Sequence, residues 1–175
     1  MPEIVKPDIK VNIRIEPKTC RHYYNDQLVV VHCHHYATLY TQLAMDAEQA
    51  DLLQDVSEEM FFKVLSDYFK ENETPNFFDR LTIGCQLFGL MGLGSVTFRY
   101  AGENSADLIL TRSHVDKGWI RKWGKSDQPV NFIGAGAIAG MLACIFNKPA
   151  GTYLVRETKS LAMGEDYSEM KAVKR

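Results

Sequence analysis

The sequence predicts an α+β domain in which an antiparallel sheet packs against a layer of helices. Two features of the apolar pattern lead to this fold class. After a short β-rich segment at the N-terminus, helical spacing dominates the first half of the chain, and pairs of strands flank the helices of the second half. Strands and helices that do not alternate one by one favour this class over a doubly wound parallel sheet.

The N-terminal segment is expected to form a β-hairpin extension. Apolar and polar residues alternate over 9–16, which predicts a half-buried strand, and the apolar residues 28–31 supply its partner. We therefore assign residues 1–31 to the hairpin extension and residues 32–175 to the main domain.

From about residue 34, the spacing of apolar residues becomes that of an α-helix, and turn-forming residues separate the successive elements. The first helix begins near residue 34, and further helices are expected at 51–70, 76–88, 116–123 and 132–146. Strands are expected at 95–101 and 106–111, and a closing hairpin starts at residue 153 and turns at residues 163–166. The chain therefore has enough regular structure for one compact domain.

Composition excludes several classes of function. The chain has 20 basic and 22 acidic residues among its 175, with no basic stripe of the kind that binds nucleic acid. Its longest apolar run, residues 132–146, is shorter than the roughly 20 residues that cross a bilayer. Four scattered cysteines without a Cys-x-x-Cys pair are typical of a reduced protein. We expect a soluble, cytoplasmic protein without a nucleic-acid partner or a membrane span.

The densest group of chemically active side chains is the run His32, Cys33, His34 and His35. Imidazole and thiolate are good ligands for zinc, copper or iron, but neighbouring residues point in different directions on a strand or a helix. Two interpretations stay open: a metal site at His32, His34 and His35, or pocket-lining histidines at a strand–helix junction. A completing metal ligand would come from His22, His114 or Glu157.

Small residues and aromatic residues suggest close packing in the second half of the chain. The helix at 132–146 carries glycine or alanine at positions 134, 136, 140 and 143, which allows close approach of another helix or of a flat ligand. Trp119 and Trp123 are four residues apart and share a helical face. Each feature fits either core packing or the wall of a ligand pocket.

The last third of the chain resembles the vinyl-4-reductase domain. The resemblance rests on residues 126–132, on the small-residue helix that follows, and on residues 155–171, and it covers about 126–173. That family includes hydrocarbon-binding proteins and the sensory domains of phenol- and xylene-responsive regulators. It shares its fold with trafficking subunits that hold an acyl chain.

In metal-bearing relatives, the resemblance places zinc ligands at a cysteine after a Pro-Val pair, at a glutamate, and at two cysteines in the pattern Glu-x2-Cys-x7-Cys. In this chain, these positions are Asn131, Glu157, Ser160 and Ser168. Neutral oxygens and an amide are weak ligands for zinc. We therefore expect no metal and no cofactor at this site, and a cluster of hydrogen bonds that holds the turn instead.

The resemblance further implies an internal apolar pocket that binds an aromatic, hydrocarbon or acyl molecule. The candidate lining residues are His34, Tyr36, Phe88, His114, Trp119 and Phe132. We expect a homodimer, with an interface helix face of Leu52, Val56, Met60 and Val64, and a separate signalling or enzyme partner for any output. Two alternatives stay open: an enzyme or accessory protein of a reductive or biosynthetic pathway that uses the His32–His35 cluster, and a dimeric assembly module.

Overall fold

The computed structural model describes residues 8–30, 33–74 and 76–175. The strands are β1 (Ile13–Glu16), β2 (Arg21–Tyr24), β3 (Gln27–Val29), β4 (Gly94–Ala101), β5 (Ser105–Ser113), β6 (Tyr153–Lys159) and β7 (Ser168–Lys174). The helices are α1 (His34–Asp46), α2 (Ala50–Glu71), α3 (Phe77–Leu90), α4 (His114–Trp123) and α5 (Phe132–Ile145), with a 3₁₀ turn η1 (Leu161–Met163). The predicted α+β class is confirmed.

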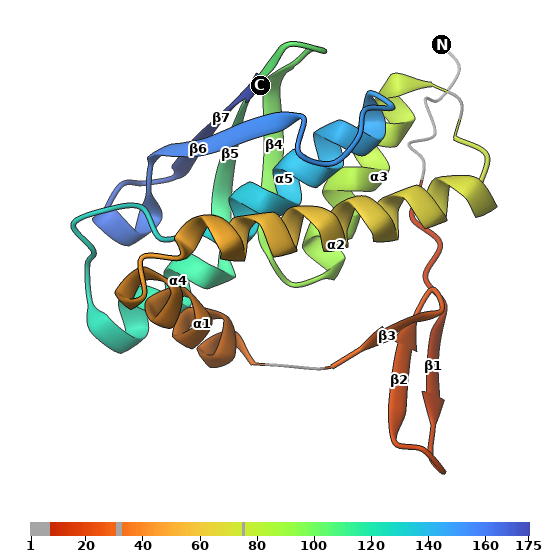
Figure 1. The fold of residues 1–175 in the computed structure, drawn as a ribbon, viewed down its shortest axis with the longest axis horizontal. Coiled ribbons are helices and arrows are strands. Elements are labelled where there is room, and N and C mark those ends of the chain that lie inside the picture. The colour runs from red at the N-terminus through yellow and green to blue at the C-terminus, as the bar shows by residue number, and fades with distance from the viewer. Residues whose placement is uncertain (1–7, 31–32, 75) are drawn as a thin grey trace.

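The main sheet has the strand order β4-β5-β7-β6, and all its neighbouring strands are antiparallel. The helix α5 packs against both β6 and α2, and Figure 1 shows α2 lying across α5. Nearly all residues of α5 are buried, as expected for a helix that is apolar on every side. This helix is therefore the centre of the domain.

Glycines of α5 allow α2 to approach closely. A Cβ atom at Gly136 would overlap the carbonyl oxygen of Gln54, and one at Gly140 would overlap that of Glu58. The small residues at positions 136 and 140 therefore serve helix–helix packing, which confirms that interpretation for these two positions.

Buried polar side chains of α2 satisfy backbone groups of its neighbours. Ser57 donates to the carbonyl of Ile133 at 2.7 Å, and Glu58 accepts from the amide of Gly151 at 2.7 Å. Because unpaired polar groups are costly in a core, these bonds fix the position of α2 on α5 and on the loop before β6.

The predicted N-terminal β-hairpin extension is confirmed, and it contains one strand more than expected, because its antiparallel sheet has three strands in the order β1-β2-β3. The strand β2 has no apolar alternation, so the sequence pattern did not reveal it. Asn25 and Asp26 have φ angles of 45° and 61°, which suits the tight turn that joins β2 to β3. Residue 31 of the expected second strand lies outside the described residues. Figure 1 shows this sheet projecting from the helical body.

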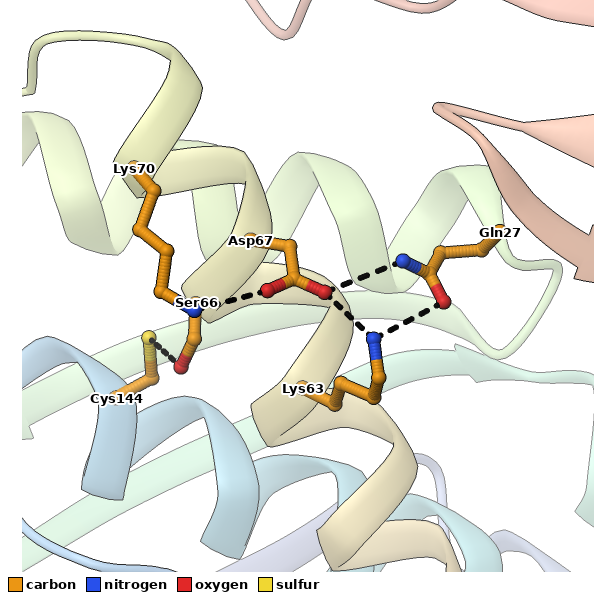
Figure 2. A network of polar contacts seen from close by, with 6 residues as sticks. All are labelled: Gln27, Lys63, Ser66, Asp67, Lys70 and Cys144. Atoms are coloured by element: carbon orange, nitrogen blue, oxygen red, sulfur yellow. Dashed lines mark hydrogen bonds and ion pairs between the residues drawn. The ribbon is translucent and has the colours of Figure 1, made fainter.

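Side-chain hydrogen bonds tie the N-terminal sheet to α2. Asp67 accepts hydrogen bonds from Gln27 at 3.2 Å, from Lys63 at 2.7 Å and from Lys70 at 3.1 Å (Figure 2). The hydrogen bonds from Lys63 and Lys70 hold the pKa of the Asp67 carboxyl below its ordinary value. The carboxylate therefore stays charged at neutral pH and anchors Gln27 of β3.

Within the described part of the chain, no helix is both long and apolar enough to span a lipid bilayer.

Candidate functional site

A buried polar network lies where α4 and α5 begin. Asp116 belongs to the first turn of α4 and is fully buried. Ser113 caps this helix, because its Oγ accepts the amide hydrogen of Asp116 at 3.2 Å. Asn131 caps α5 in the same way, with its Oδ1 accepting from the amide of Gly134 at 2.9 Å. The two helix caps bring both polar side chains into one interior corner.

Asn131 connects the two caps to the closing hairpin. Its Nδ2 donates to Ser113 Oγ at 3.0 Å and to Asp116 Oδ2 at 3.1 Å. Its backbone amide donates to Glu157 Oε2 at 3.3 Å. One residue therefore links α4, α5 and β6.

The two serines of the closing hairpin complete the network. The hydroxyl of Ser160 donates to Asp116 Oδ1 at 2.9 Å, and the amide of Ala162 donates to the same oxygen at 3.2 Å. Ser168 Oγ accepts from the amide of Leu161 at 3.0 Å. Ser160 and Ser168 are both fully buried. The turn through η1 is thus bound to α4 by hydrogen bonds.

The structure places Asn131, Glu157, Ser160 and Ser168 in this one network. The sequence analysis missed Asp116, which is the acceptor at its centre. A signal for it was present, because Ser113 and Asp116 have the Ser-x-x-Asp spacing that marks a helix N-terminus. That spacing predicts a cap but not a contact with the distant hairpin.

Two carboxyl groups share this corner, which perturbs the pKa of Glu157. Burial, followed by the charge of Asp116, raises the pKa of Glu157 to about 7, and the Ser168 hydroxyl, the Asn131 amide and the Ser160 hydroxyl only partly oppose this. Glu157 Oε1 is buried and has no hydrogen-bond partner among the described residues. Because burial and a nearby negative charge both disfavour a further charge here, Glu157 keeps its proton to a higher pH than an exposed glutamate does.

Zinc does not fit the donors of this corner. Zinc in proteins prefers thiolate and imidazole ligands, whereas the network offers two carboxyl groups, hydroxyls and one amide. Among the residues that the structure describes, no group of three or more His, Cys, Asp or Glu side chains could hold a metal ion. The hydrogen bonds described above join α4, α5 and the closing hairpin at this corner.

Three of the six candidate lining residues lie at the packed surface of α1 and α4. His34 begins α1, and burial, the nearby His35 and further positive neighbours, among them His114 of α4, lower its pKa. Gly118 lets α1 approach, because a Cβ there would overlap Thr38 Oγ1. Below this surface, Trp119 is buried.

The remaining candidates lie elsewhere or at the edge of that region. Phe88 is fully buried in the main core, with its ring centroid 6.3 Å from that of Phe61. Tyr36 is exposed on α1, and Phe132 is the half-buried first residue of α5. The structure therefore brings His34 near His114, buries Trp119 in a small cluster with Val130 and Ala162, and places Phe88 in the main core.

The histidine run lies at the start of α1. Cys33 Sγ is 3.6 Å from His35 Nδ1, and the rings of His34 and His35 stack with centroids 4.2 Å apart. His32 lies outside the described residues, so the metal site at His32, His34 and His35 stays a prediction. Glu157, one of the residues considered as a completing ligand, belongs to the buried corner.

Comparison with known proteins shows the fold. No protein-family model and no curated protein sequence matches this chain, but solved structures do. The phenol-responsive sensory domain of the transcription activator PoxR, solved with phenol, matches with a TM-score of 0.75 and 14% identity, over 93% of this chain and 84% of that one. The fold is shared.

Two further structures have the same fold. A trafficking protein particle complex subunit 3 from Naegleria fowleri, covalently bound to palmitic acid, matches with a TM-score of 0.54 and 13% identity, over 80% of this chain and 90% of that one. A vinyl-4-reductase family protein from Methanocaldococcus jannaschii matches with a TM-score of 0.54 and 16% identity, over 84% of each chain. The expected fold relationship is therefore confirmed, while identities this low carry no function by themselves.

Proposed function

We propose that this chain binds a small hydrophobic molecule, namely an aromatic, hydrocarbon or acyl compound, and serves as a binding or sensing domain. The observation that carries the proposal is the fold shared along 93% of the chain with a phenol-responsive sensory domain. The chain needs no catalytic group and no cofactor for this role.

The surface between α1 and α4 is the proposed place for the ligand. Small-molecule sites combine an apolar wall with a few polar groups that orient the ligand. Trp119 supplies apolar surface here, while His34 and His114 supply imidazole groups that can bond a ligand hydroxyl or carboxylate. Burial lowers the pKa of His34, so its imidazole is neutral at pH 7 and can accept a hydrogen bond.

The test is thermal unfolding in the presence of phenol, toluene and palmitate. A ligand at 100 times its Kd stabilises the folded state by about 2.7 kcal/mol, so at least one compound should raise the Tm by several degrees. The variant Trp119→Leu should lose the increase. The control Phe78→Leu, which replaces an aromatic residue that is 75% exposed on α3, should keep it. Unchanged Tm values with all three compounds would refute the proposal.

We also propose a homodimer, because apolar side chains are exposed on α2. Leu52 is 58% exposed and Val56 is 56% exposed, and Met60 lies one turn further along the same face. Val64, expected on this face, is half-buried and packs against the core, so it contributes to folding. Exposed apolar faces of this kind mark interaction sites.

Light scattering after size-exclusion chromatography tests the dimer. The unaltered chain is expected at twice its monomer mass, and Val56→Lys is expected to yield monomers with unchanged circular dichroism. Glu165→Lys, which introduces the same side chain at an exposed position of the closing hairpin, serves as the control and should stay dimeric. A monomeric unaltered chain would exclude this part of the proposal.

We further propose a cytoplasmic location and a separate signalling or enzyme partner. The four cysteines are free thiols, which suits a reducing compartment. Fractionation of cells that express a tagged chain tests the location. Cross-linking with and without the identified ligand tests for a partner whose contact depends on the bound state.

A further inference from the structure

A cleft of about 480 Å³ opens between the C-terminal half of α2, the start of α3 and the loop that follows α5. Its volume lies within the range of small-molecule sites. None of the candidate lining residues from the sequence analysis borders it. The cleft therefore shares no lining residue with the proposed hydrophobic site.

One side of the cleft is apolar and uncharged. Phe62 and Phe69 of α2 contribute aromatic rings, and Cys144 of α5 contributes a buried thiol. Ser66 and Cys144 contact each other, with Oγ and Sγ 3.3 Å apart (Figure 2). Burial raises the pKa of the Cys144 thiol above its ordinary value, so the thiol is neutral at pH 7 and does not repel an anion.

The other side of the cleft carries Arg80, which is held in place without an acidic partner. Its Nε donates to the carbonyl of Thr74 at 3.0 Å and its Nη1 donates to Asn147 Oδ1 at 2.9 Å. The guanidinium lies 5.0 Å from the ring centroid of Phe69. Among the described residues Arg80 forms no ion pair, and its further N–H donors remain for a ligand.

Two lysines add positive charge at the rim. Lys70 pairs with Asp67 at 3.1 Å (Figure 2) and Lys148 pairs with Glu103 at 2.6 Å. Neither acidic partner lines the cleft, and no other Asp or Glu of the described residues does. The cleft therefore presents cations and aromatic rings to a ligand, and no carboxylate.

We propose that this cleft binds a small organic carboxylate with an aromatic body. The ring of the ligand packs against Phe62 and Phe69, and its carboxylate pairs with Arg80, with Lys70 and Lys148 adding attraction. A planar guanidinium suits a carboxylate because two parallel N–H groups can donate to its two oxygens. The apolar side distinguishes such a ligand from an inorganic anion.

Calorimetric titration of the full chain with benzoate tests the proposal, with benzamide as its neutral isostere and inorganic phosphate as a charged ligand without a ring. Benzoate should bind with one site per chain, and both benzamide and phosphate should bind at least about tenfold more weakly. Benzamide binding as tightly as benzoate, phosphate binding as tightly, or no saturable benzoate binding would each overturn the proposal.

Variants locate the benzoate site. Arg80→Gln should weaken benzoate binding at least about tenfold, and Lys148→Gln should weaken it less. Lys122→Gln, at an exposed lysine of α4 that does not line the cleft, should leave benzoate binding unchanged. If Arg80→Gln does not fold, Lys148→Gln and the benzamide comparison on the unaltered chain still decide the matter. Unchanged benzoate affinity in folded Arg80→Gln would place the anion elsewhere and overturn the proposal. Binding of phenol or toluene should be the same in Arg80→Gln, which separates this site from the proposed hydrophobic one.

Discussion

Replacing Glu157 by glutamine removes one of the two buried acids while keeping the shape of the side chain. In the unaltered chain, burial and the charge of Asp116 raise the pKa of Glu157 from 4.5 to about 7. The unfolded chain releases this proton at about the ordinary value. Between pH 4.5 and pH 7, the folded state therefore binds more protons than the unfolded state.

This difference in bound protons sets the direction and the size of the pH effect on the free energy of unfolding. The free energy of unfolding falls as the pH rises through that window and levels off above it. A change of one pH unit in the pKa corresponds to about 1.4 kcal/mol, so the pKa change of Glu157 costs about 3 kcal/mol of stability at pH 8. The variant Glu157→Gln has no such charge to bury, so it should escape most of this loss.

Urea unfolding at pH 5, 6, 7 and 8 measures the effect. Glu157→Gln should be close to the unaltered chain in stability at pH 5 and more stable by up to about 3 kcal/mol at pH 8. Glu165→Gln removes the same charge from an exposed position of the same hairpin and should show no such crossover. The reasoning is refuted if the unaltered chain has a flat profile from pH 5 to pH 8, or if Glu157→Gln lowers stability equally at every pH.

The packing of α5 against α2 and the expectation that no metal is bound can also be tested. Gly136→Ala places a Cβ against the backbone of α2 and should lower the free energy of unfolding by about 1–3 kcal/mol. The control Gly89→Ala changes a helical glycine with ordinary contacts and should be neutral or stabilising. Equal losses of stability in the two variants would contradict the close approach of α5 to α2. The unaltered chain should purify without stoichiometric zinc, and the triple variant Asn131→Cys, Ser160→Cys and Ser168→Cys should gain zinc, measured by atomic emission, because thiolates replace weak ligands. Failure of a folded triple variant to bind zinc would show that these positions do not face one another as ligands must.

Elements that depend on local pattern could be predicted from the sequence. The expected helix at 51–70 corresponds to Ala50–Glu71, and the one at 132–146 corresponds to Phe132–Ile145. Apolar residues at helical spacing predict the first helix, and a long apolar run predicts the second, which is buried on every side. The strand Arg21–Tyr24 was missed because pairing with two neighbouring strands stabilises it, while its side chains stay largely exposed and show no alternation.

The candidate site was only partly accessible from the sequence. The positions of Glu157, Ser160 and Ser168 could be identified by resemblance, but Asp116 is 44 residues from Ser160 along the chain. Nothing local to either residue indicates that contact. The positive charge of the cleft and the place of Arg80 in it could not be predicted from the sequence either. They depend on side chains from α2, α3, α5 and the loop that follows α5.

The sequence by itself determined the class of fold, most of its helices, and the presence of hydroxyl groups, not thiolates, at Ser160 and Ser168 of the closing hairpin. Residue identity decides these features, because periodicity sets local structure and a serine cannot act as a soft metal ligand. Only the tertiary structure decided that Asp116 and Glu157 share a buried corner, and that Arg80 borders an aromatic cleft without an acidic partner in the part of the chain that the structure describes. Proton affinity and charge pairing depend on distance and burial in space, and these arise only when distant segments of the chain pack together.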